Sequence, residues 1–154
     1  MSAALLTSAF LSFAGVLVTA WYGFTDASLS RHILFGIFST MLTLLTHSML
    51  MFYLIGKGKA VREAAEEGGL SNDFARRIAE LRRPVFSLAT LAMSLTIVTA
   101  LLGASVDTRM LPSSIHGISA ALAVAANVAM LRTEISALMA SADVVAEVDR
   151  LLNA

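Results

Sequence analysis

The chain has 154 residues, of which 57% are hydrophobic and only 14% are charged, and its mean hydropathy is +0.78. A water-soluble domain of this length cannot bury so much apolar surface, so the composition indicates an integral membrane protein. The net charge of zero identifies no acidic or basic partner, and the lack of cysteine excludes disulfides, thiolate metal sites and cysteine nucleophiles.

Four long segments contain no Asp, Glu, Lys or Arg, and each predicts a transmembrane helix: residues 3–24, 32–55, 84–104 and 115–131. At about 1.5 Å per residue, the first three are long enough to cross a hydrocarbon core about 30 Å thick, and the fourth is marginal. A chain in lipid must satisfy its own backbone hydrogen bonds. We therefore expect an all-α integral membrane protein built as a four-transmembrane-helix bundle.

The distribution of basic residues predicts the orientation. Residues 56–83, between the second and third spans, hold seven of the eleven Lys and Arg residues, whereas the connections on the other side are short and hold one Arg each. The positive-inside rule therefore places this long loop in the cytoplasm. Both termini are then also cytoplasmic, and we expect the protein in the inner, or plasma, membrane of the cell.

The cytoplasmic segments have helical patterns of their own. In the loop, KAVREAAEE is followed by two glycines, and SNDFARRIAELRR leads into Pro84, which predicts a helical hairpin extension. In residues 132–153, apolar residues recur at helical spacing and predict an amphipathic C-terminal helix, at Ile135, Leu138, Met139, Ala142, Val145, Val148 and Leu152. This helix could pack on the hairpin, on the membrane surface or on another subunit.

The two halves of the sequence resemble each other. Each half has a span that ends near a Gly, a short connection with Asp and Arg, and a His that opens the next span. Gly23 matches Gly103, and His32 matches His116 after a four-residue insertion. Because both halves begin on the same side, the pattern predicts two parallel-repeat hairpins related by an approximate two-fold axis along the membrane normal.

Ionisable side chains at membrane depth are candidates for function, and the only ones in the expected spans are the three histidines. The repeat sets His32 and His116 at one depth on spans two and four, where they could ligate one metal centre. Gly36 leaves room for a flat macrocycle beside them. Arg31 and Arg109 lie near that surface and could pair with haem propionates.

His47 is a third candidate metal ligand. It lies on broadly the same face of its span as His32, about 22 Å further along at 1.5 Å per residue, and level with Met130. A second haem held by these two side chains is geometrically conceivable, since Met/His ligation occurs in cytochromes. The alternative is a hydrogen bond from His47 to a neighbouring helix.

In architecture the chain resembles the small four-helix b-type cytochromes and the haem-carrying membrane anchors of respiratory enzymes, which hold haem between histidines of different spans. It departs from a two-haem pattern because a fourth histidine is missing. The resemblance implies a membrane protein or subunit that binds haem b and transfers electrons, with bis-histidine ligation between spans two and four. For His32 and His116 the plainer alternative is an interfacial capping role.

The sequence also leaves other functions open. The competing hypothesis is a cofactor-free structural or scaffold subunit of a larger or homo-oligomeric complex, assembled through the cytoplasmic hairpin and the C-terminal helix. A transporter is less favoured, because no acidic residue lies within the spans. No catalytic motif is present, so we expect no independent enzymatic activity. The basic loop lacks the aromatic residues and net charge typical of nucleic-acid binding.

Overall fold

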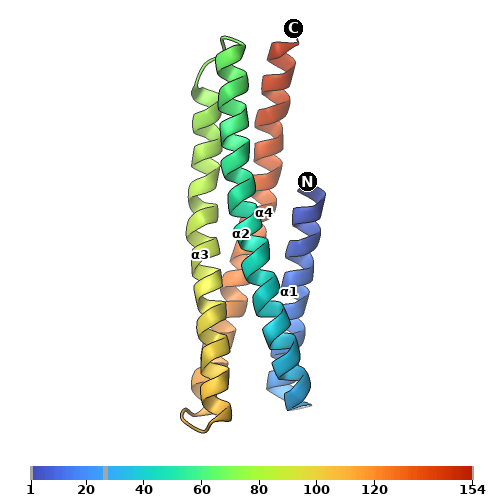
Figure 1. Cartoon of the computed structure of the whole chain (residues 1–154), viewed down its shortest axis with the longest axis vertical. Coiled ribbons are helices and arrows are strands. Elements are labelled where there is room, and N and C mark those ends of the chain that lie inside the picture. Colours follow the sequence, from blue (N-terminus) through green and yellow to red (C-terminus); the bar gives the residue numbers. More distant parts are fainter. Residues whose placement is uncertain (1, 26–27, 154) are drawn as a thin grey trace.

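The computed structural model describes residues 2–25 and 28–153, apart from the side chain of Ser2. Within these ranges the chain forms four helices and no strand: α1 (Ser2–Thr25), α2 (Leu29–Glu67), α3 (Asp73–Asp107) and α4 (Ser113–Leu152) (Figure 1). All four are long and apolar enough to cross a membrane. The prediction of an all-α chain with four helices able to span a membrane is therefore confirmed.

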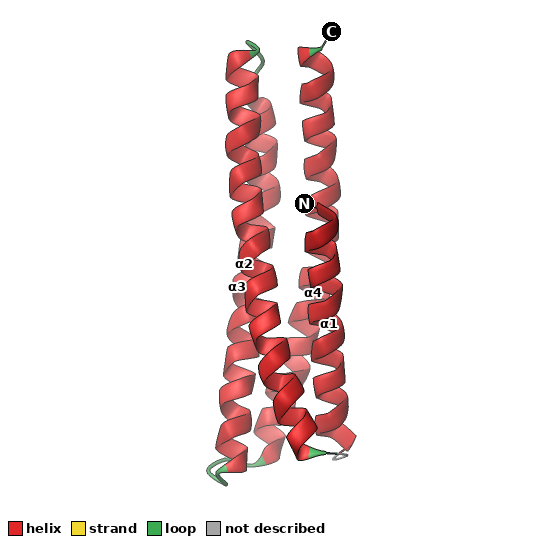
Figure 2. Cartoon of the chain, turned by 45° about the vertical axis from the view of Figure 1, so that its right-hand side comes forward, coloured by secondary structure: helices red, strands yellow, loops and turns green. Residues whose placement is uncertain are grey.

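Three of the helices continue far beyond the expected spans. α2 runs on to Glu67 and α3 begins at Asp73, so residues 56–83 are two helical segments joined by a short turn. Pro84 lies inside α3, and the C-terminal segment continues α4 without a break. We call the part of α2, α3 and α4 beyond these points, residues 56–67, 73–83 and 132–152, the extension. In Figures 1 and 2 it continues well past the start of α1.

The extension has its own apolar core, to which each of its three helices contributes. Val61 of α2 packs with Phe74 and Ile78 of α3 and with Val144 and Val148 of α4. An ion pair between the Arg77 guanidinium and the Glu147 carboxylate joins α3 and α4 at 2.7 Å. Of the three positions that the sequence left open for the C-terminal helix, the one against the hairpin is therefore observed.

The buried face of the C-terminal helix differs in part from the predicted one. Leu138 and Val148 are buried as expected, but Met139, Ala142 and Leu152 are exposed. The remaining buried positions between residues 132 and 152 are Glu134, Ala137, Ser141 and Val144. The prediction counted apolar side chains only, whereas the buried face also includes small residues and one carboxylic acid.

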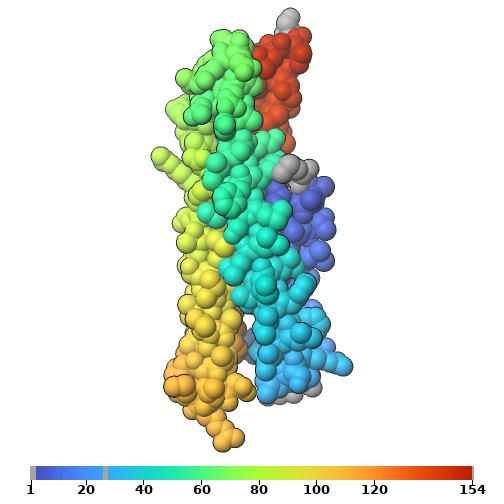
Figure 3. Space-filling model, in the orientation of Figure 1, coloured from blue at the N-terminus to red at the C-terminus, as the bar shows by residue number. Residues whose placement is uncertain are grey.

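Packing is uneven along the bundle. A central core that includes Leu50, Leu54, Val85 and Met130 fills the middle. At the end that carries the connections between α1 and α2 and between α3 and α4, no described residue in the ranges 13–38 and 97–118 is buried. We call this the histidine end. In the space-filling view the pair α1–α2 and the pair α3–α4 stand apart there (Figure 3).

Candidate functional site

His32 and His116 lie against each other at the histidine end. Their ring centroids are 5.8 Å apart, and the ring planes are inclined by 80°. His32 stands one turn into α2 and His116 one turn into α4, so each ring reaches across from a different helix pair. The structure thus brings together the two histidines that the sequence pattern set at one depth.

Each ring is fixed by the same kind of hydrogen bond. The Nδ1 atom of His32 lies 2.9 Å from the carbonyl oxygen of Thr19, and that of His116 lies 3.0 Å from the carbonyl oxygen of Thr99. A carbonyl oxygen only accepts hydrogen bonds, so Nδ1 carries the proton in both neutral rings. The lone pair of each ring is then on Nε2, which is the arrangement found in metal-ligating histidines.

Two glycines make room for these rings. A Cβ atom added to Gly23 would lie 2.7 Å from Cε1 of His32, and one added to Gly103 would lie 3.1 Å from Cε1 of His116. The sequence pattern paired these glycines as repeat positions without giving them a role. A larger residue at either position would force the neighbouring imidazole to shift, so the two glycines allow the observed ring positions.

The other predicted cofactor residues are less clearly placed. Gly36 is partly buried, and the methyl group of Thr19 lies 3.5 Å from a Cβ built on it. The guanidinium of Arg31 lies 3.4 Å from the Tyr22 hydroxyl and stacks over that ring. Arg109 is exposed in the connection before α4, with a positive φ of 58°. Neither arginine contacts the histidine pair, so their predicted role toward propionates stays a prediction.

The histidine pair fits a haem iron in donor set and in spacing. Two imidazole nitrogens that ligate one iron from opposite sides, at about 2 Å each, put the ring centroids about 6.3 Å apart. The observed 5.8 Å is close to this spacing. No described residue in the ranges 13–38 and 97–118 is buried, so packed side chains do not enclose the pair. The two donor nitrogens and their spacing are thus compatible with one iron between them.

His47 lies apart from this pair, in the packed middle of the bundle. Its Nε2–H donates to Oδ1 of Asn127 at 3.2 Å, and Asn127 in turn donates to Thr96 and to the carbonyl oxygen of Ala123. This is the interhelical hydrogen bond that the sequence offered as the alternative to ligation. Among the described residues, no group of three or more His, Cys, Asp and Glu side chains could hold a metal ion.

The sequence reasoning missed one residue altogether. Glu134 of α4 is completely buried, and neither carboxylate oxygen has a hydrogen-bond partner among the described residues. It lies three residues beyond the expected fourth span, and only ionisable residues within the spans were candidates for function. Burial raises the pKa of its carboxyl to about 7. The only signal in the sequence was its position four residues after Met130, on the same helix face.

No protein-family model, curated protein or solved structure matches the chain. The geometry of the site must therefore carry the functional conclusion by itself.

Proposed function

We propose that this chain is a small membrane haem b protein, or the haem-bearing subunit of a larger membrane complex, with His32 and His116 as the axial ligands. The observation that carries the proposal is the pair of facing imidazoles whose Nδ1–H groups are both held by backbone carbonyls. Bound haem would supply one-electron transfer through its iron. The function is thus electron transfer within or at the membrane.

A bare metal ion suits this pair less well. Zinc and similar ions take three or four protein ligands, and no third His, Cys, Asp or Glu joins the two histidines among the described residues. Haem brings four equatorial nitrogens with it and needs only two axial ligands from the protein. The small ligand set therefore favours a cofactor that completes its own coordination.

The residues of the chain have separate roles in this proposal. The carbonyl groups of Thr19 and Thr99 orient the two imidazoles and keep Nε2 free to ligate. Gly23 and Gly103 allow each ring to lie against the preceding helix. Exposed apolar side chains such as Phe24 and Leu101 would contact lipid there and limit the access of water.

The proposal includes the finer architecture and its orientation. The two helix pairs are parallel-repeat hairpins, supported by the equivalent contacts of His32 with Thr19 and of His116 with Thr99. The extension and both termini lie in the cytoplasm, supported by the basic residues of the extension, and the membrane is the inner, or plasma, membrane. A protein partner docks on the hairpin and the C-terminal helix of the extension.

A spectrum tests the proposal directly. The full chain, expressed with ample haem and purified in detergent, should show a Soret band and, on reduction, the α and β bands of a low-spin bis-histidine haem. His32→Ala and His116→Ala should each abolish the low-spin spectrum. His47→Ala is the matched control and should keep it. A colourless wild-type protein, or a spectrum that survives the loss of both His32 and His116, would refute bis-histidine ligation.

The competing function, a cofactor-free scaffold subunit, is supported by the projecting extension, where Met139, Leu151 and Leu152 are exposed. It predicts a colourless protein that stays in a defined complex, or in a homo-oligomer, through detergent exchange. Deletion of residues 135–154 should then break the complex without altering membrane insertion. The same deletion should leave the spectrum of a haem protein intact if the extension only docks a partner.

A further inference from the structure

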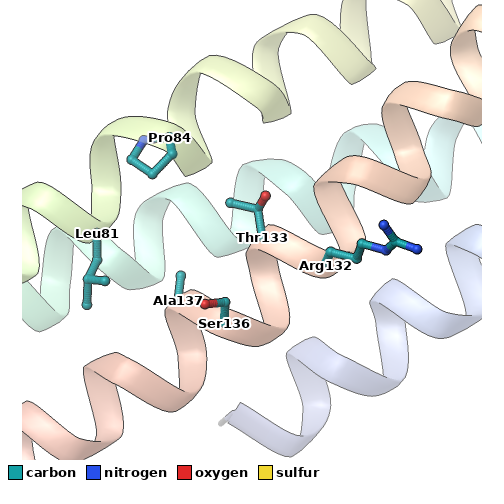
Figure 4. Close-up of a pocket in the computed structure, with 6 residues that line it drawn as sticks. All are labelled: Leu81, Pro84, Arg132, Thr133, Ser136 and Ala137. Atoms are coloured by element: carbon teal, nitrogen blue, oxygen red, sulfur yellow. The ribbon is translucent and has the colours of Figure 1, made fainter.

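A groove between α3 and α4 lies where both helices pass from their uncharged segments into the extension. Its volume is about 250 Å³, and it is lined by Leu81, Pro84, Arg132, Thr133, Ser136 and Ala137 (Figure 4). Pro84 is the first residue of the uncharged segment of α3, and Arg132 is the first charged residue after that of α4. With the uncharged segments in the hydrocarbon core, the groove lies at the level of the lipid headgroups.

The arginines beside this groove lack the acidic partners that other basic residues of the extension have. Four ion pairs stabilise the extension: Lys59 with Glu63, Arg62 with Glu66, Arg76 with Asp73, and Arg77 with Glu147. Neither Arg132 nor Arg83, which precedes Pro84, forms an ion pair with any described residue, and both are exposed. Their positive charge is therefore available to an anion from outside the chain.

The polar groups of the groove suit a phosphate. Among the lining residues drawn in Figure 4, the Arg132 guanidinium lies farthest from Leu81, with Ser136 between them. The Ser136 hydroxyl forms no hydrogen bond with a described residue and is free to donate, whereas the Thr133 hydroxyl already donates to the carbonyl oxygen of Ala129 at 3.0 Å. A guanidinium can donate two parallel hydrogen bonds to one phosphate. The groove thus offers donors and positive charge together.

The neighbouring groove, farther from the uncharged segments, suits an anion less well. It is lined in part by Arg77, Glu80 and Asp143. Arg77 is already paired with Glu147, so its charge is compensated within the chain. The carboxylates of Glu80 and Asp143 would repel a phosphate. An anion between α3 and α4 is therefore favoured at the Arg132 groove.

Exposed apolar side chains continue from the groove into the uncharged segments. Leu91 lies seven residues after Pro84 on α3, and Leu122 lies eleven residues before Thr133 on α4. Spacings of seven and eleven return to nearly the same face of a helix. Leu91 is 49% exposed and Leu122 54%. The faces that carry the groove therefore also offer apolar surface to acyl chains, which a free phosphate ion would not use.

We infer that the groove between α3 and α4 binds the phosphodiester headgroup of an anionic phospholipid. Arg132 and Ser136 donate hydrogen bonds to the phosphate, Arg83 adds positive charge, and the acyl chains lie along the faces of Leu91 and Leu122. Basic pockets between transmembrane helices are known to take anionic headgroups. The site is distinct from the histidine pair and needs no haem. A bound lipid would hold the start of the extension at the membrane surface.

Lipid binding is measured by native mass spectrometry of the full chain in detergent, titrated with phosphatidylglycerol or with zwitterionic phosphatidylcholine. One phosphatidylglycerol should bind about tenfold more tightly than phosphatidylcholine, and Arg132→Ala should remove about tenfold of this affinity. Arg132→Lys keeps the charge without the paired donors and should lose less. Arg150→Ala is the matched control, because it removes an exposed arginine without an ion pair near the far end of the same helix.

A second pair of variants tests the groove itself. Ser136→Phe fills it and should abolish the preference for phosphatidylglycerol, whereas Ala142→Phe adds the same ring at an exposed position that lines neither groove and should keep it. Equal affinity for the two lipids, or equal losses in Arg132→Ala and Arg150→Ala, would overturn the inference. Displacement of the lipid by an equal concentration of inorganic phosphate would also overturn it and indicate a free-anion site. A colourless protein would refute haem binding without altering these results.

Discussion

The histidine end and the packed middle of the bundle differ in how far their polar side chains are enclosed. At the histidine end, the two imidazoles are tied by Nδ1 to backbone carbonyls, while no described residue in the ranges 13–38 and 97–118 is buried. In the middle, His47 bonds to Asn127 amid buried side chains, and where the extension begins Glu134 is enclosed, with no hydrogen-bond partner among the described residues. The imidazoles at the histidine end are oriented but not enclosed, whereas the polar groups of the other region are enclosed.

The two regions therefore contribute differently to folding and to ligand binding. A region that orients its ligands and leaves space gains little folding free energy from packing, but it can accept a bound group without first being unpacked. A closed region stabilises the bundle and makes each of its buried polar groups sensitive to substitution. Substitutions in the middle should therefore change stability, and those at the histidine end should change haem binding.

The largest effect is expected from the buried carboxyl. The pKa of Glu134 is raised to about 7 in the folded protein, against about 4.3 in an unfolded chain. Between these values the folded state binds more protons, so stability is highest below about pH 4.3 and falls as the pH rises toward 7. This loss is about 3 kcal/mol. Thermal unfolding in detergent should show it, and Glu134→Gln should flatten the pH dependence without moving the haem spectrum.

Asn127→Ala should have the next largest effect. It leaves the Nε2–H of His47 without its acceptor inside the packed middle, which we expect to destabilise the fold by about 1–3 kcal/mol. Asn153→Ala, the same change at an exposed position, is the control and should be nearly neutral. Denaturation midpoints measure both. If Asn127→Ala abolished the low-spin spectrum, the two regions would not be independent.

Gly23→Ala should change haem affinity rather than stability. The added Cβ at 2.7 Å from Cε1 forces the His32 ring to shift, so we expect haem affinity to fall about tenfold or more, which is about 1.4 kcal/mol, with little change in stability. Gly56→Ala is the matched control, because no atom lies within 4 Å of a Cβ there. Haem titration of both variants gives the comparison. Equal affinities would contradict a ligand role for His32 in its present position.

The smallest effect is expected from the surface of the extension. Arg77→Ala removes the ion pair with Glu147, whose two side chains are partly exposed, and should lower stability by less than about 1 kcal/mol. Lys59→Ala, which removes the more exposed pair with Glu63, should change stability even less. Unfolding at low and high salt measures the difference. A large, salt-independent loss for Arg77→Ala would mean that the extension depends on this pair more than on its apolar core.

Much of the candidate site could be predicted because it follows from chain order. The spans are uncharged over the length of a membrane, and helices joined by short connections must return, which sets His32 and His116 at one end. The role of Gly23 could not be predicted. Whether a glycine faces a ring depends on the rotation of α1 about its axis, and apolar residues all around a helix leave that rotation undetermined.

The sequence alone determined four helices long and apolar enough to span a membrane and the turn that folds back residues 56–83, because charge, length and glycine positions act locally. Only the tertiary structure decided that α4 runs unbroken onto the hairpin, that His47 bonds to Asn127, and that Glu134 is enclosed. Burial of a polar side chain depends on which helix covers its face. That choice is made by packing between helices distant in sequence, and no local pattern encodes it.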